Sequence, residues 1–169
     1  MRLFVGLRPS EAFRSALAEA QDRLRAASVA GRYLDPVYLH MTLAFVGEWS
    51  GEITPILPAV TEPFPVVLSH LGLFPEAKVL WAGVRPSPAL NRLTESVRKT
   101  LAENGVPFDR KAFNPHITLV RKPSLPAGLV LPEMEIPSAS MVVNEVCLYQ
   151  SVHGENGMEY TVIGSTLDR

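Results

Sequence analysis

The feature that most constrains the fold is an internal repeat. Residues 6–10, Gly-Leu-Arg-Pro-Ser, return 77 residues later as residues 83–87, Gly-Val-Arg-Pro-Ser. A second pair of segments repeats at nearly the same spacing of 76 residues: His-Met-Thr-Leu at 40–43 and His-Ile-Thr-Leu at 116–119. Two segments that recur at one spacing indicate a duplicated structural unit. We therefore expect two similar halves that face each other about a pseudo-twofold axis.

Each copy of the repeat predicts a strand followed by a helix. Apolar runs at 3–5 and 79–82 precede the repeated turn and indicate strands. Ser10 and Ser87 are preferred N-cap residues, and apolar side chains follow each of them at helical spacing. Gly105 is placed to end the second helix.

A second strand should close each unit, over 39–46 in the first copy and 115–120 in the second. Strand–helix–strand connections usually have a right-handed crossover, so we expect each helix to pack on the sheet of its own half. Residues 51–60 carry two prolines and predict a short or broken helix.

The remaining elements are strands. One is expected over 65–74, and two more over 141–152 and 159–167, on either side of the hairpin signal Gly-Glu-Asn-Gly at 154–157. This mixture of strands and helices predicts an α+β fold, and no linker separates independent domains. We expect residues 1–169 to form a single domain of two similar lobes.

Composition narrows the range of partners and compartments. Sixteen Lys and Arg against seventeen Asp and Glu give a net charge of −1, which argues against coating long stretches of nucleic acid. The single cysteine, Cys147, cannot close an intrachain disulfide, so a reducing compartment fits best. The N-terminal apolar run is too short for a signal peptide, and no stretch is long enough to span a membrane. A cytoplasmic protein with no membrane role is the expectation.

The repeated His-x-Thr segments are the candidate site. In a strand, residues i and i+2 point to the same face, so His40 lies with Thr42, and His116 lies with Thr118. If the pseudo-twofold axis brings the two polar faces together, a cleft lined by two imidazoles and two hydroxyls results.

Such a set suits phosphoryl chemistry. Imidazole, with an ordinary pKa near 6.5, both accepts and donates protons near neutral pH. Hydrolysis of a cyclic phosphodiester needs one group to deprotonate water and another to protonate the departing sugar oxygen. The hydroxyls would hold the non-bridging oxygens. This scheme requires no metal or cofactor, and the chain carries no His-Glu-x-x-His, His-x-His or phosphate-binding loop motif.

Other candidate residues have structural alternatives. A single His-x-Thr is usually a half-buried polar pair, and only its recurrence with the repeat favours a joint site. Arg121 follows Thr118 by three residues, nominally on the other face, and is either a phosphate ligand or a solvated charge. Tyr33 is either a base-stacking residue or part of the core or rim.

The remaining histidines and the cysteine are expected to be structural. We interpret His70 as a satisfied strand residue, His153 as an exposed turn residue and Cys147 as a buried thiol. Arg8 and Arg85, in the repeated turns, are also expected to be structural.

At this point the residues resemble the 2H phosphoesterase superfamily, which has two His-x-Thr/Ser motifs. More narrowly, the chain looks like a bacterial RNA 2′,3′-cyclic phosphodiesterase of the 2′-5′ RNA ligase-like group. The resemblance runs almost end to end, through residues 2–7, 39–48, 79–84, 115–121 and 149–151.

The resemblance implies a bilobal duplicated fold, with two antiparallel sheets about the pseudo-twofold axis, helices outside and a central active-site cleft. It also implies metal-independent hydrolysis of an RNA-terminal 2′,3′-cyclic phosphate to a 2′-phosphate. By that analogy His40 is the proton donor to the leaving 3′ oxygen and His116 is the proton acceptor that activates water. The repeat alone leaves these two roles interchangeable. Thr42, Thr118 and Arg121 would hold the phosphate.

The chain departs from the usual pattern in having Tyr33 where a tryptophan is common, and prolines after Glu52. Neither departure affects the catalytic set, but both bear on substrate choice. One alternative is therefore a phosphodiesterase acting on small cyclic nucleotide phosphates, and another is a non-catalytic nucleotide-binding module. We expect a monomer with no obligate protein partner.

Overall fold

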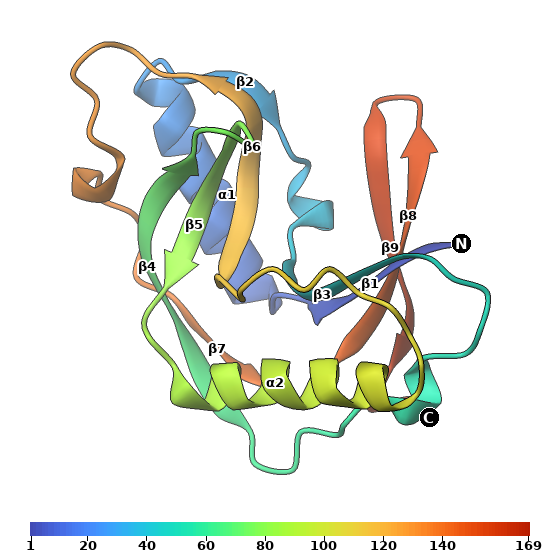
Figure 1. The fold of residues 1–169 in the computed structure, drawn as a ribbon. Helices are drawn as coiled ribbons and strands as arrows, with labels where there is room; N and C mark the ends of the chain where they lie inside the picture. Colours follow the sequence, from blue (N-terminus) through green and yellow to red (C-terminus); the bar gives the residue numbers. More distant parts are fainter.

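The protein consists of nine strands, two long helices and three short 3-10 helices (Figure 1). The computed structural model describes all residues, 1–169. In chain order the elements are β1 (Arg2–Leu7), α1 (Glu11–Ala26), β2 (Ala30–Tyr33), η1 (Pro36–Tyr38), β3 (Met41–Glu48), η2 (Thr54–Ile56), β4 (Phe64–Phe74), β5 (Val79–Val84), α2 (Pro88–Glu103), β6 (His116–Ser124), η3 (Leu131–Glu133), β7 (Ser140–Val143), β8 (Cys147–Gly154) and β9 (Gly157–Ser165). The predicted α+β class is confirmed.

All strand pairs are antiparallel, and they form two groups that meet at one point. The strand order is β7-β4-β5-β6-β3-β1-β8-β9, with β2 pairing to β6. The two groups, β7-β4-β5-β6 and β3-β1-β8-β9, are joined only where Met41 of β3 pairs with Ile117 of β6. Met41 lies between His40 and Thr42, and Ile117 follows His116 directly. The joint between the halves therefore places the two predicted motifs side by side.

Helix α1 packs on the other half, so the expectation that each helix packs on the sheet of its own half is wrong for α1, whereas α2 lies against strands of both halves. Helix α1 follows β1 of the first copy but lies against β6 and β7, whereas α2 of the second copy lies against β3 and β4. Gln21 of α1 fixes this arrangement, because its buried amide donates to the Leu34 and Leu119 carbonyls at 2.8 and 3.1 Å. The crossover rule concerns parallel strands, and β1 and β3 are antiparallel neighbours.

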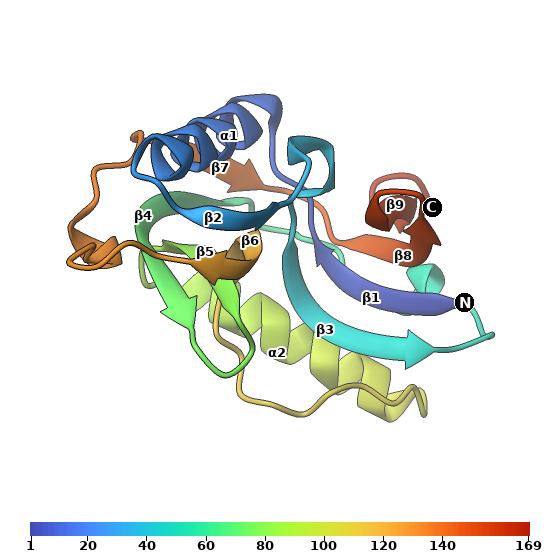
Figure 2. The ribbon, with the colours of Figure 1, turned by 90° about the horizontal axis from the view of Figure 1, so that it is seen from above.

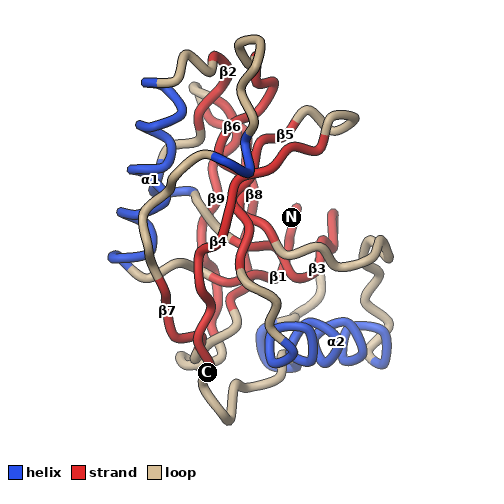
Figure 3. Tube along the Cα trace, turned by 90° about the vertical axis from the view of Figure 1, so that its left-hand side faces the viewer, coloured by secondary structure: helices blue, strands red, loops and turns tan.

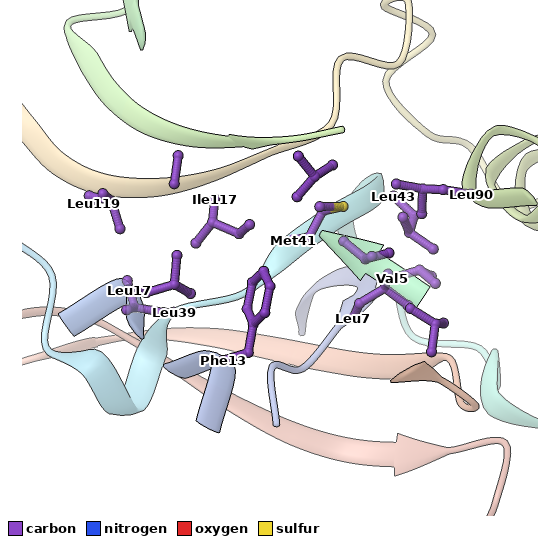
Figure 4. Close-up of a cluster of buried hydrophobic side chains, with 14 of the residues drawn as sticks. Val5, Leu7, Phe13, Leu17, Leu39, Met41, Leu43, Leu90, Ile117 and Leu119 are labelled. Atoms are coloured by element: carbon purple, nitrogen blue, oxygen red, sulfur yellow. The ribbon is translucent and has the colours of Figure 1, made fainter. Parts of the chain in front are cut away.

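The helices lie on opposite sides of the strands, as Figures 2 and 3 show. One apolar core nevertheless runs through both halves. In Figure 4, Phe13 and Leu17 of α1 lie beside Leu39, and Ile117 and Leu119 of β6 face the same cluster. All five of these side chains are almost completely buried.

The repeated Gly-x-Arg-Pro-Ser turn has a physical explanation in both copies. The Ser10 hydroxyl accepts from the Phe13 amide at 3.2 Å, and the Ser87 hydroxyl accepts from the Leu90 amide at 3.1 Å, so both serines cap helices as predicted. A Cβ at Gly6 would stand 2.5 Å from the Met41 carbonyl oxygen. Only glycine therefore allows β1 and β3 to approach this closely beside the first motif.

Three secondary-structure elements differ from those expected from the sequence. Strand β2 was not predicted, because its exposed residues show no alternation. The run at 141–152 divides into β7, which pairs with β4, and β8, which pairs with β1. The helix expected over 51–60 is reduced to the 3-10 turn η2. The predicted hairpin is present, with Gly157 at φ +115° directly after its turn.

No helix has the length and apolar character required to cross a membrane.

Candidate active site

The two motif histidines are held in the same way. Nδ1 of His40 lies 2.8 Å from the Tyr38 carbonyl oxygen, and Nδ1 of His116 lies 2.7 Å from the Asn114 carbonyl oxygen. In each case the carbonyl belongs to the residue two positions earlier. A carbonyl only accepts, so Nδ1 carries the proton and donates, and in the neutral ring Nε2 carries the lone pair. Both imidazoles thus have Nε2 as the atom available for proton transfer.

A bulge in each motif strand brings a third residue to the site face. Leu80 and Trp81 of β5 pair with Val120 and Thr118 of β6, which leaves Leu119 as the extra residue. Because a bulge adds one residue, Arg121 returns to the face of Thr118, although simple alternation places it on the other side. An equivalent bulge in β3 brings Phe45 to the position that matches Arg121.

Aromatic rings surround His40. Ring centroids of Phe4, Tyr160 and Tyr149 lie 4.6, 4.8 and 5.4 Å from that of the imidazole. The pKa of His40 is lowered to about 4, chiefly by this burial and to a smaller extent by the positive charges of Arg121 and of protonated His116, while the Tyr38 carbonyl opposes the shift. The Tyr160 ring beside His40 also has its hydroxyl 3.4 Å from Nη2 of Arg121, so one aromatic residue contacts both side chains.

His116 has its own aromatic neighbours. Phe74 lies edge-on at 5.0 Å between ring centroids and Trp81 at 6.5 Å. Burial lowers the pKa of His116 below its ordinary value, and Arg121 adds to the effect. Both imidazoles are therefore neutral at pH 7 in the free protein, and a bound anion would favour their protonated forms.

The lowered pKa of His40 predicts a loss of stability in acid. Between about pH 6.5 and 4 the unfolded chain binds a proton that the folded chain resists, so this contribution is present above pH 6.5 and is lost as the pH falls. At about 1.4 kcal/mol per pKa unit, the full effect of His40 is roughly 3–4 kcal/mol, of which roughly 2–3 kcal/mol is lost between pH 7.5 and 4.5. Urea unfolding at pH 7.5 and 4.5 should show a smaller pH effect in His40→Gln than in the wild type.

The matched control is His153→Gln, because His153 is exposed on the β8–β9 hairpin. In this variant the free energy of unfolding should differ between pH 7.5 and pH 4.5 by the same amount as in the wild type. If this difference is the same in His40→Gln as in the wild type, the lowered pKa of His40 is contradicted.

The motif threonines have free hydroxyls. Thr42 pairs with Gly6 and Thr118 pairs with Trp81, both are half-buried, and neither hydroxyl makes a hydrogen bond within the protein. The flanking residues at alternate positions, Met41 and Ile117, are buried, as predicted. The hydroxyls are therefore available to the oxygens of a ligand.

A cleft of about 600 Å³ lies beside these residues. Its lining includes Arg121 and Tyr160, whose atoms Nη2 and OH are 3.4 Å apart, and Tyr160 in turn contacts His40. The other side chains that matter here are Arg25, Arg32, Tyr38 and Asn156. The lining includes neither of the motif histidines and neither of the motif threonines, so this cleft adjoins the paired motifs and does not contain them.

Tyr33 lines the same cleft but has other neighbours than the histidines. It pairs with Val120, on the opposite face of the sheet from Arg32 and Arg121. Its hydroxyl donates to the Val29 carbonyl at 2.6 Å, and the Arg25 guanidinium lies 4.2 Å from the ring centroid. The structure thus does not place Tyr33 beside His40 and His116.

The residues interpreted as structural have the expected surroundings. His70 lies in β4 with Nδ1 3.1 Å from the Ser69 hydroxyl, and Cys147 is fully buried, with burial raising its thiol pKa to about 12. Arg8 pairs with Glu145. The described chain holds no cluster of three or more His, Cys, Asp or Glu side chains arranged for a metal ion.

The aromatic residues around the histidines were missed from the sequence. Phe4 and Tyr149 come from the paired strands β1 and β8, and Tyr160 comes from β9. All three lie on strands of the same group as β3, which follows the first motif. That location is the only feature of the sequence that could have identified them as site residues. Arg32 was not among the predicted site residues, and it lies in β2 opposite Arg121.

Comparison with known proteins identifies the family to which this chain belongs. Residues 9–155 match the model of the 2′-5′ RNA ligase superfamily. The chain belongs to this superfamily. An Escherichia coli relative named RNA 2′,3′-cyclic phosphodiesterase is 32% identical over 138 residues, which are 78% of this chain and 77% of that protein.

Further members of the superfamily agree. A Geobacillus stearothermophilus relative of the same name is 35% identical over 129 residues, and the match covers 66% of this chain but 40% of that protein. The crystal structure of E. coli LigT in apo form superposes with a TM-score of 0.79 at 28% identity, covering 97% of this chain and 95% of that one. The predicted family, the duplicated fold and the phosphodiesterase class of enzyme are confirmed.

Proposed function

We propose that this protein hydrolyses an RNA-terminal 2′,3′-cyclic phosphate to a 2′-phosphate by acid–base catalysis with two histidines and without a metal. The observation that carries the proposal is the matched setting of His40 and His116. Each Nδ1 is bound to a backbone carbonyl, so each Nε2 is the atom left for proton transfer. The names of the superfamily relatives support a cyclic phosphate as substrate.

In this mechanism Nε2 of His116 accepts a proton from water as the water oxygen attacks phosphorus. The bond from phosphorus to the 3′ oxygen breaks, and protonated His40 gives its proton to that oxygen. The products are a 2′-phosphomonoester and a 3′ hydroxyl, and the two histidines have exchanged protonation states, which solvent resets. Atoms and charges therefore balance without another reactant.

The environment of His40 suits the role of proton donor. Its low pKa makes the protonated imidazole a strong acid, and the negative charge of the bound phosphate raises that pKa enough for the proton to be present in the complex. Thr42 and Thr118 offer free hydroxyls, and Arg121 offers a guanidinium, to the non-bridging oxygens. We also propose that residues 1–169 act as one domain, because a single core joins the two halves.

An assay with a short RNA ending in a 2′,3′-cyclic phosphate tests the proposal. In the presence of EDTA we expect turnover to continue and the product to be the 2′-phosphate, resolved from the 3′-phosphate by chromatography. Activity that disappears with EDTA and returns with a divalent ion would replace this mechanism with a metal-dependent one. Binding without turnover would indicate a nucleotide-binding module instead.

A smaller substrate remains the second candidate. The E. coli LigT structure with 3′-AMP shows that a relative of this fold binds a mononucleotide. Comparing a cyclic mononucleotide with a cyclic-phosphate RNA in the same assay separates the two substrate classes.

A further inference from the structure

Two arginines stand directly opposite each other on neighbouring strands. Arg32 of β2 pairs in register with Arg121 of β6, and paired residues of an antiparallel ladder point to the same face. This is the face that carries Thr118 and His116. Like charges at such positions destabilise a sheet unless an opposite charge lies between them.

No carboxylate of the protein compensates this pair. The ion pairs of the chain involve neither Arg32 nor Arg121. The Arg121 guanidinium donates only to the Tyr160 hydroxyl, and the exposed Arg32 makes no side-chain hydrogen bond. Arg25, by contrast, is bound to Asp22 at 2.9 Å. An anion from outside the protein is therefore the natural partner of Arg32 and Arg121.

The cleft beyond Arg121 can hold more than one phosphate group. Its volume of about 600 Å³ lies within the range of small-molecule sites. Arg25, Arg32 and Arg121 line it, together with two carboxylates, Asp35 and Glu159. The Asp35 carboxylate accepts from the Val37 amide at 3.0 Å, and neither Asp35 nor Glu159 forms an ion pair with an arginine of the cleft.

The chemistry of the substrate sets the direction of the bound chain. A 2′,3′-cyclic phosphate ends an RNA, so every other nucleotide lies on its 5′ side. With the cyclic phosphate between the histidines and against Arg121, the chain must leave on one side of the site. The side of β4 and β5 presents the rings of Phe74 and Trp81, whereas the side of β2 presents Arg32.

We propose, building on the function proposed above, that Arg32 binds the phosphate one nucleotide 5′ of the cyclic phosphate. The cleft is then an RNA subsite, and Arg32 is the residue by which the enzyme prefers an oligonucleotide to a cyclic mononucleotide. Arg121 serves the reacting phosphate, and Arg32 serves its neighbour in the chain.

Kinetics of Arg32→Ala on two substrates test this subsite. For a tetranucleotide ending in a 2′,3′-cyclic phosphate, we expect kcat/KM to fall about tenfold, as for loss of one charged hydrogen bond. For cytidine 2′,3′-cyclic monophosphate, kcat/KM should stay within about twofold of the wild type. The plot of log kcat/KM against log salt for the tetranucleotide should become less steep by about 0.7, because one phosphate contact is lost.

Two further variants complete the design. Arg32→Lys keeps the charge and should recover most of the activity on the tetranucleotide. Arg92→Ala is the matched control, because Arg92 is an exposed, unpaired arginine of α2 that does not line this cleft. This variant should have the kcat/KM of the wild type on both substrates.

The outcomes separate this inference from the function on which it rests. An equal fall of kcat/KM on both substrates in Arg32→Ala would place Arg32 at the reacting phosphate. An unchanged kcat/KM on both would show that Arg32 binds no part of the substrate. Either result overturns the inference. If the wild type turns over neither substrate, the proposed function fails. Anisotropy with a fluorescein-labelled tetranucleotide bearing a terminal 2′-phosphate then decides: weaker binding by Arg32→Ala supports the subsite, and equal binding overturns it.

Discussion

Replacing His116 by alanine is expected to lower kcat/KM on a cyclic-phosphate RNA by about 10²- to 10⁴-fold, the usual contribution of a general acid or base. His40→Ala should have a loss of similar size. The two histidines act in the same step, so the double variant should lose much less than the product of the two single losses. Steady-state kinetics of the three variants in EDTA measure these effects.

The control for the histidine series is His70→Gln. His70 of β4 pairs with Gly83, which in turn pairs with His116, so His70 shares the face of His116 without belonging to either motif, and its Nδ1 contacts the Ser69 hydroxyl. The variant therefore tests whether a nearby histidine outside the motifs contributes. It should retain activity near that of the wild type, and circular dichroism should show that all variants are folded. A histidine variant that is folded and fully active would remove the corresponding residue from the mechanism.

Arg121→Ala is expected to cause the second large loss, about 10²- to 10³-fold in kcat, because a positive charge beside the developing negative charge is removed. It should also change the pH dependence. Arg121 lowers the pKa of both His40 and His116, so without its charge both values rise. The limbs of the kcat/KM profile, which report the free enzyme, should therefore move to higher pH.

The conservative variant separates the charge of Arg121 from its geometry. Arg121→Lys keeps the positive charge but loses the planar pair of donors, so the pH profile should stay in place while kcat recovers only in part. Arg85→Ala, at an exposed and unpaired arginine, is the control. An unchanged pH profile in Arg121→Ala would show that its charge does not reach the histidines.

Much of the site was predictable because both His-x-Thr segments recur at the spacing of the internal repeat. Pairing of Met41 with Ile117 brings the motifs together, and both His-x-Thr segments alternate between buried and accessible residues as expected. The position of Arg121 was not predicted, since it depends on one extra residue, Leu119. The only mark of this bulge in the sequence is the pair of consecutive apolar residues Leu119 and Val120, which also suits a strand buried on both faces.

The fold was predictable in its elements but not in its connections. The first residues of both helices followed from Ser10 and Ser87, whose hydroxyls cap α1 and α2. Strand β2 escaped detection because only its pairing with β6 makes it a strand, and that pairing is what places Arg32 beside Arg121. Long-range contacts of this kind lie outside what local periodicity reports.

The helix contacts also bear on how this chain folds. Helix α1 of the first half lies against β6 and β7, and α2 of the second half lies against β3 as well as β4, so either half alone would expose apolar surface. The chain therefore has one shared core rather than one core in each half. Its core forms only when segments far apart in the chain meet, so the two halves are expected to unfold in a single cooperative transition.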